Sequence, residues 1–212
     1  MSEPFAKKVK GFLLKPSETF QATQAESLNS AFQYYVRLLI IFSVLMFLLI
    51  AVSIALSGSG GSATGSAGPL SGVLGIRGAS LLNAFKPFLA TFILILPFLL
   101  FMMGLFGIFL SGFQYHVFVL LFGGQKGLVQ TVKTLMYAVT PVLLIGWIPF
   151  VSIIGGIWYL ILIAIGIREN QEMTTRRAVL VVLVPVVLNL ILLAVMFVAA
   201  GAFIRALTGL PA

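Results

Sequence analysis

The chain has 212 residues, of which 60% are hydrophobic and only 8% are charged, and its mean hydropathy is +1.16. Soluble globular domains carry about a quarter charged residues, so this composition excludes a water-soluble protein and indicates an integral membrane protein. The net charge is +8. The basic residues lie at the ends of apolar segments and form no patch with aromatic residues between them, which excludes nucleic acid as a partner.

Residues 1–34 form a polar leader ahead of the first long apolar run. Four apolar residues of this leader share one face of a helix: Phe5, Val9, Phe12 and Leu13. Four lysines point elsewhere, namely Lys7, Lys8, Lys10 and Lys15. This pattern predicts an amphipathic helix on a membrane surface, with the lysines against anionic lipids; a solvated basic tail is the alternative. Pro16 is expected to end this helix and Ser17 to cap a second one.

A helix of roughly 20 apolar residues can cross a bilayer. The apolar runs of this chain predict five transmembrane helices, at about 35–56, 87–122, 132–147, 150–167 and 178–203. Between the first two, residues 57–68 read SGSGGSATGSAG, which is the composition of a flexible linker. The expected fold class is therefore all-α: one polytopic bundle of five membrane helices over residues 35–212, preceded by the interfacial helix.

The basic residues predict the orientation of these helices, because cytoplasmic loops carry an excess of lysine and arginine. With a cytoplasmic N-terminus, ten basic residues lie inside and three, at positions 77, 86 and 205, lie outside. Splitting 87–122 into two crossings would lower this asymmetry. We therefore expect a multi-pass protein of the cell membrane with its N-terminus in the cytoplasm and its C-terminus outside.

Residues that carry catalytic chemistry are scarce. The chain has one histidine, no aspartate and no cysteine, and none of its five glutamates falls within a predicted span. A carboxylate pair, a catalytic triad or a metal cluster cannot be built from this set within the bilayer, so we expect no enzymatic activity, no cofactor and no metal. His116 is expected to make an interfacial polar contact at a helix end; pH sensing or metal binding is the alternative.

Three polar residues in the apolar runs, Tyr137, Thr140 and Asn189, lie near Pro141 and Pro185. Polar groups in membrane helices usually face other helices. One interpretation is that these residues satisfy backbone carbonyls freed by the prolines. The other is a polar seam between the third and fifth spans that passes or binds a small solute.

The segment 168–177, RENQEMTTRR, is the densest group of charges after the first span. Simple positive-inside anchoring would need only arginines, so the added acidic and amide residues favour a surface for a protein partner. Its candidate residues are Arg168, Glu169, Glu172, Arg176 and Arg177. Small residues four apart, such as Gly107 and Ser111, suit helix packing within one chain or in a homo-oligomer.

Several short motifs resemble those of Yip1-domain membrane proteins. They are the Pro16-Ser17-Glu18-Thr19-Phe20 leader, His116, Gly123-Gly124, Thr131, Tyr137-Ala138, Pro141 and Ile167-Arg168. The resemblance implies a five-helix protein whose eukaryotic relatives act in Golgi and endoplasmic-reticulum trafficking and contact Rab-type GTPases. This chain lacks their long hydrophilic N-terminal region and is similar to the short prokaryotic form.

Two functions are compatible with this sequence. The first is a non-enzymatic scaffold that organises membrane lipids or partner proteins, which the missing catalytic groups and the amphipathic leader favour. The second is a transporter or channel for a small solute or ion, which the prolines and the polar seam favour, because broken helices build solute sites in transporters.

Overall fold

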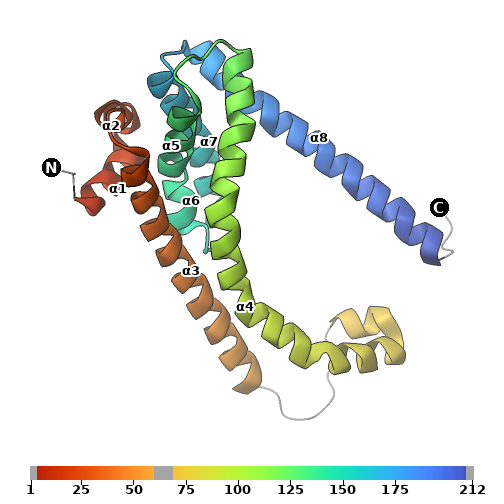
Figure 1. Cartoon of the computed structure of the whole chain (residues 1–212). Coiled ribbons are helices and arrows are strands. Elements are labelled where there is room, and N and C mark those ends of the chain that lie inside the picture. Colours follow the sequence, from red (N-terminus) through yellow and green to blue (C-terminus); the bar gives the residue numbers. More distant parts are fainter. Residues whose placement is uncertain (1–3, 60–68, 209–212) are drawn as a thin grey trace.

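The computed structural model describes residues 4–59 and 69–208, without the side chains at 54–91, 93, 94, 204 and 206–208. Within this part of the chain every regular element is a helix (Figure 1). The helices are α1 (Phe5–Leu14), α2 (Pro16–Thr23), α3 (Leu28–Ser59), α4 (Pro69–Leu121), α5 (Leu128–Ala138), α6 (Thr140–Ile145), α7 (Val151–Asn170) and α8 (Thr175–Thr208).

Five stretches of these helices are long and apolar enough to cross a membrane. They are Leu28–Ser53, Ile95–Leu121, Leu128–Ile145, Val151–Asn170 and Thr175–Phe203. The prediction of an all-α protein with five membrane helices is confirmed. Several predicted boundaries move. The largest change is in α4, which begins at Pro69, well before residue 87, and α3 includes the first residues of the Gly/Ser segment. The rest of that segment, 60–68, lies outside the described residues.

The third span is broken into α5 and α6 at Val139. Pro141 has no backbone N–H to donate to the carbonyl of Tyr137, four residues earlier. The hydroxyl of Thr140 donates to that carbonyl instead, at 2.5 Å. This contact is the role that the sequence suggested for a polar side chain beside a proline.

The buried side chains gather at one end of the bundle. We call this part, residues 5–39, 108–143 and 162–182, the packed end. The α5 helix lies at its centre, in contact with α3, α4 and α7, and is buried from Thr131 to Ala138. Below it in Figure 1, α3 and α4 run on together, while α8 diverges from the other helices.

We call residues 187–203 of α8 the splayed end. In α8 nearly every side chain there is exposed, including Phe197 at 80% and Val198 at 70%. Such apolar faces are the normal lipid-facing surface of a membrane helix.

Two glycines allow the close approach of helices at the packed end. A Cβ on Gly112 of α4 would lie 2.5 Å from the side chain of Val132 in α5. A Cβ on Gly166 of α7 would lie 2.6 Å from Thr134 and 2.7 Å from the ring of Phe20. Because neither contact is sterically possible, these positions require glycine, and they bring α4 and α7 tightly against α5 and α7 tightly against α2.

Candidate functional site

The N-terminal helix α1 packs against the membrane helices. Phe12 is fully buried; its ring stacks on Tyr137 at 4.8 Å between centroids and meets Phe20 edge-on at 4.9 Å. Phe5 lies 5.4 Å from Tyr34, and Val9 is partly buried beside the same core. The predicted amphipathic helix is confirmed, but its apolar face covers the protein's own helices and does not enter the bilayer at these positions.

Lys8 lies on this buried face. Its Nζ donates to both carboxylate oxygens of Glu26, at 2.5 and 2.7 Å, and its side chain is only 6% exposed. The prediction that Lys8 contacts lipid headgroups is therefore wrong. The physical reason is that a buried ammonium needs a close counter-charge, and Glu26, in the turn between α2 and α3, supplies it.

Glu26 joins α1 and α5 to the turn between α2 and α3. It accepts a hydrogen bond of 2.6 Å from the hydroxyl of Tyr137 in α5 as well as the bonds from Lys8 in α1. Burial raises the pKa of the Glu26 carboxyl. The hydrogen bonds from Lys8 and Tyr137 and the charges of Lys8 and Lys133 together lower the pKa by more than burial raises it. The net pKa lies below the ordinary value of 4.5, so the carboxylate is ionised at neutral pH and the cluster is held by charge.

Lys133 is a residue whose role the sequence reasoning missed. It lies within the third span, is 2% exposed, and donates through Nζ to the carbonyls of Gln24 at 2.8 Å and Glu26 at 2.6 Å. It thereby fastens the turn after α2 to α5. The available signal was the spacing of Lys133 and Tyr137, which places both side chains on one face of a helix.

The end of α7 is fastened to α2. Arg168 donates to the hydroxyl of Ser17 at 2.9 Å and forms an ion pair with Glu169. Gln21 donates to the Glu169 carboxylate at 2.8 Å, and Gln24 donates to the Glu169 carbonyl at 2.6 Å.

Glu169 has a side chain that is only 13% exposed. The prediction that Glu169 faces a partner protein is wrong, because its carboxylate is already bound by Gln21 of α2. Arg168 is committed to α2 in the same way, although about a third of its side chain stays exposed.

A second set of polar contacts joins the two loops of the packed end. Gln171 donates to Thr131 at 3.0 Å and to the carbonyl of Gly127 at 3.2 Å, and it accepts from the backbone of Lys126. Thr131 also lies 3.0 Å from Nδ1 of His116. The structure thus places His116 against α5, half-buried, within a network that ties α4 to the loop before α5.

The remaining motif positions also lie at the packed end. Pro16 begins α2, and Phe20 is fully buried against Gly166. Gly123 has φ +91, a left-handed conformation that favours glycine, and it allows Gly124 to donate back to the carbonyl of Val119 at 2.8 Å. Together these two glycines turn the chain out of α4.

The predicted polar seam does not form. Tyr137 and Thr140 lie together, and the Thr140 hydroxyl is 3.0 Å from the hydroxyl of Tyr34. Asn189, in contrast, lies on α8, which packs mainly on α7 and α4, and it accepts a bond from Gln114 of α4 at 3.5 Å. The structure therefore does not support the seam between the third and fifth spans, the second of the two interpretations, because α8 packs on α7 and α4.

Four charged residues in the two loops and at the start of α8 are exposed beside these networks. We call Lys126, Glu172, Arg176 and Arg177 the charged rim. Lys126 and Glu172 form an ion pair at 2.8 Å with side chains 46% and 66% exposed, and both arginines are exposed at the start of α8. Among the described residues no group of three or more histidines, cysteines or carboxylates could hold a metal ion.

The helices and their apolar lengths define a multi-pass, all-helical membrane protein. The model of the Yip1 domain matches residues 10–196, which include α2, the first four spans and most of the fifth. The chain belongs to the Yip1-domain family. No match was found among curated proteins or among solved structures.

Proposed function

We propose that this protein is a non-enzymatic scaffold of the membrane, which holds partner proteins or lipids at its packed end. The observation that carries the proposal is the fastening of the leader to the membrane helices. Lys8, Glu26 and Tyr137 join α1 to α5, and Glu169 joins α2 to α7. This gives the packed end a fixed shape, and a fixed shape lowers the entropy that a binding surface loses on association.

The surface proposed for a protein partner is the charged rim. Buried side chains such as Lys133 and Asn170 are used within the chain, where they donate to Gln24, Glu26 and Thr134. The rim side chains are exposed instead. Exposed charges steer encounters and select partners by complementarity, which supports a contact role for these residues.

The same contacts argue against transport as the main role. Tyr34, Tyr137 and Thr140 bind one another or Glu26. Asn189 of α8 lies apart from them and accepts a hydrogen bond from Gln114 of α4. A solute path needs polar groups lining a passage through the bilayer. The proposed setting is the plasma membrane, with the N-terminus in the cytoplasm, the packed end on the cytoplasmic side of the bundle and the C-terminus outside.

The experiment is crosslinking in native membranes, followed by mass spectrometry of the captured proteins and lipids. Reversing the charge at the rim with Arg176→Glu and Arg177→Glu is expected to lower the recovery of specific protein partners. The matched control is Arg205→Glu at the far end of α8, which removes an exposed arginine distant from the rim. Equal recovery from wild type and the rim variant would contradict the proposed surface.

Charge reversal beside a span can invert a membrane protein, so the same samples need a topology check. A cysteine at Thr174 should react with an impermeant thiol reagent only after lysis, in wild type and variant alike. Flux of a solute or ion above that of empty liposomes, abolished by Tyr137→Phe, would overturn the scaffold in favour of transport.

A further inference from the structure

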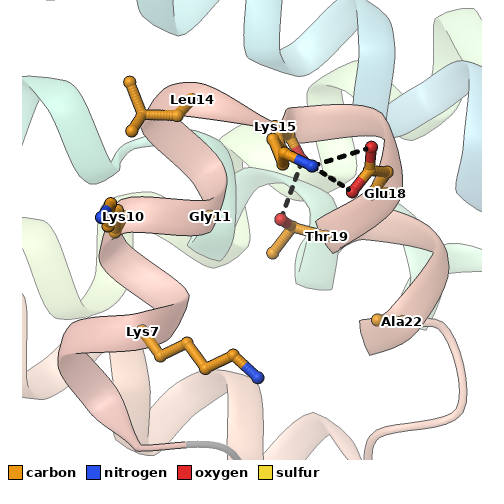
Figure 2. Close-up of a pocket in the computed structure, with 8 residues that line it drawn as sticks. All are labelled: Lys7, Lys10, Gly11, Leu14, Lys15, Glu18, Thr19 and Ala22. Carbon is orange, nitrogen blue, oxygen red and sulfur yellow. Dashed lines mark hydrogen bonds and ion pairs between the residues drawn. The ribbon is translucent and has the colours of Figure 1, made fainter.

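A groove lies between α1 and α2 on the surface of the packed end (Figure 2). Its volume is about 410 Å³, within the range of about 300–1,000 Å³ typical of sites for small molecules. Figure 2 shows α1 and α2 facing each other across it, with Gly11 opposite Thr19. The lining residues are Lys7, Lys10, Gly11, Leu14, Lys15, Glu18, Thr19 and Ala22.

The groove is a built feature of the two helices. A Cβ on Gly11 would lie 2.6 Å from Oγ1 of Thr19, so glycine lets α1 and α2 approach closely at this point. The Thr19 hydroxyl is held by the carbonyl of Lys15 at 2.8 Å. Phe12, the residue after Gly11, anchors α1 in the core. The groove floor therefore does not depend on the mobile ends of the lysines.

The residues that line this groove have a net positive formal charge. Three of its lining residues are lysines and one is a glutamate, which gives it a formal charge of +2. Glu18 lies 3.3 Å from Lys15, but both side chains are about 70% exposed, and exposed pairs of this kind are weak. Lys8, the other lysine of α1, is turned into the core by Glu26 and leaves this surface to Lys7, Lys10 and Lys15.

The groove is also amphipathic. Leu14, which lines the groove, is 68% exposed although it is a large apolar residue. Lysine stems, Gly11 and Ala22 add further apolar surface between the ammonium groups. A soluble anion would use the charges but not Leu14, whereas an amphiphile with a phosphate headgroup would use both.

We propose that this groove binds the phosphate-bearing headgroup of an anionic glycerophospholipid, with Leu14 against the upper part of its acyl chains. The proposal rests on the proposed function only in placing the packed end at a membrane surface. It refines the prediction of four lipid-contacting lysines. Lys7, Lys10 and Lys15 line one lipid site between α1 and α2, whereas Lys8 stabilises the fold through its ion pair with Glu26.

The test uses the full chain in phosphatidylcholine nanodiscs that contain a minor fraction of phosphatidylglycerol. Native mass spectrometry or a spin-labelled lipid measures how much phosphatidylglycerol stays bound to the protein. Each lysine near an anionic surface changes binding by about fivefold, so Lys7→Gln with Lys10→Gln should lower retention by at least about tenfold. The charge-preserving pair Lys7→Arg and Lys10→Arg should retain the lipid.

The matched control removes two positive charges from the charged rim, with Lys126→Gln and Arg176→Gln, and should leave retention nearly unchanged. Melting temperature checks that each variant is folded. The proposal is overturned if the groove variant binds as well as wild type, or if the control loses as much lipid. Displacement of the lipid by soluble glycerol phosphate or by an acidic peptide at equal concentration would also overturn it. Capture of protein partners is measured separately, so failure of either claim leaves the other testable.

Discussion

The packed end and the splayed end use the same kind of apolar helix in opposite ways. At the packed end Phe12, Phe20 and Tyr137 are fully buried, while at the splayed end Phe197 is 80% exposed. Lipid tails solvate apolar side chains as well as protein does, so helices associate in a bilayer through packing and polar contacts. The packed end has both, with glycine contacts and the Glu26 cluster. The comparison shows that the helices of this protein pack tightly in the region where polar side chains connect them.

The largest predicted effect compares one phenylalanine from each end. Phe12→Ala removes a ring that is fully buried between Phe20 and Tyr137, and such truncations cost about 3–5 kcal/mol. Phe197→Ala changes only a lipid-facing side chain and should leave stability nearly unchanged. Thermal unfolding in detergent measures both variants. Similar losses at the two positions would show that the ends are not packed differently.

The next effect concerns the charge cluster. Glu26→Gln removes the charged acceptor of Lys8 and Tyr137 and should cost about 1.5–3 kcal/mol, the range for hydrogen bonds to charged groups. Glu18→Gln is the matched control, since Glu18 is exposed in a weak pair.

The same cluster predicts a pH dependence with a definite sign. The pKa of Glu26 is lowered in the folded protein below its ordinary value of 4.5. The stability that it contributes is therefore fully present above about pH 4.5 and is lost as the pH falls through the folded pKa. The gap in melting temperature between wild type and Glu26→Gln should stay constant from pH 7 to 5 and shrink below 4.5. A gap that closes near neutrality would contradict the ionised cluster.

A smaller effect separates two glycines of α4. Gly112→Ala would force a Cβ to within 2.5 Å of Val132, and overpacking of this kind costs about 1–3 kcal/mol. Gly107→Ala, on the same helix, meets nothing within 4 Å. That change should be neutral or slightly stabilising, because alanine is the better helix former. Equal destabilisation by both substitutions would sink the assignment of Gly112 to a tight helix contact.

The smallest predicted effect is at Asn189. Its bond to Gln114 is long, at 3.5 Å, and both side chains are exposed. Hydrogen bonds between membrane helices average about 0.6 kcal/mol, so Asn189→Ala should shift the unfolding free energy by that amount or less. Tyr137→Phe, which removes the 2.6 Å bond to Glu26, should cost clearly more. A larger loss at Asn189 would revive a polar role for α8.

The sequence predicted where the helices lie along the chain better than it predicted which helices pack together. Long apolar runs identify membrane spans because length and hydropathy are local properties, and the number of spans was right. Helical periodicity also placed Phe5, Val9 and Phe12 on one face. It could not tell whether that face meets protein or lipid, since both are apolar. Lys8 was misassigned for this reason.

The polar residues show the same limit. The position of Thr140 next to Pro141 suggested one of its two possible roles, which is a contact within one helix turn. The partners of Lys133, Glu169 and Asn189 come from segments far away in the chain. Their identity depends on which helices pack together, and no spacing within one segment contains that information.

The central claim is that the leader is a fixed part of the packed end, and paired cysteines test it most directly. The chain has no cysteine of its own. Gln21 and Glu169 are hydrogen-bonded at 2.8 Å, so Gln21→Cys with Glu169→Cys should be joined rapidly within one chain by a short bismaleimide in native membranes. The control pair, Gln21→Cys with Met196→Cys at the splayed end, should not. A leader that lies free on the membrane would leave the first pair unjoined, or would join both pairs at similar rates, and either result would contradict the account.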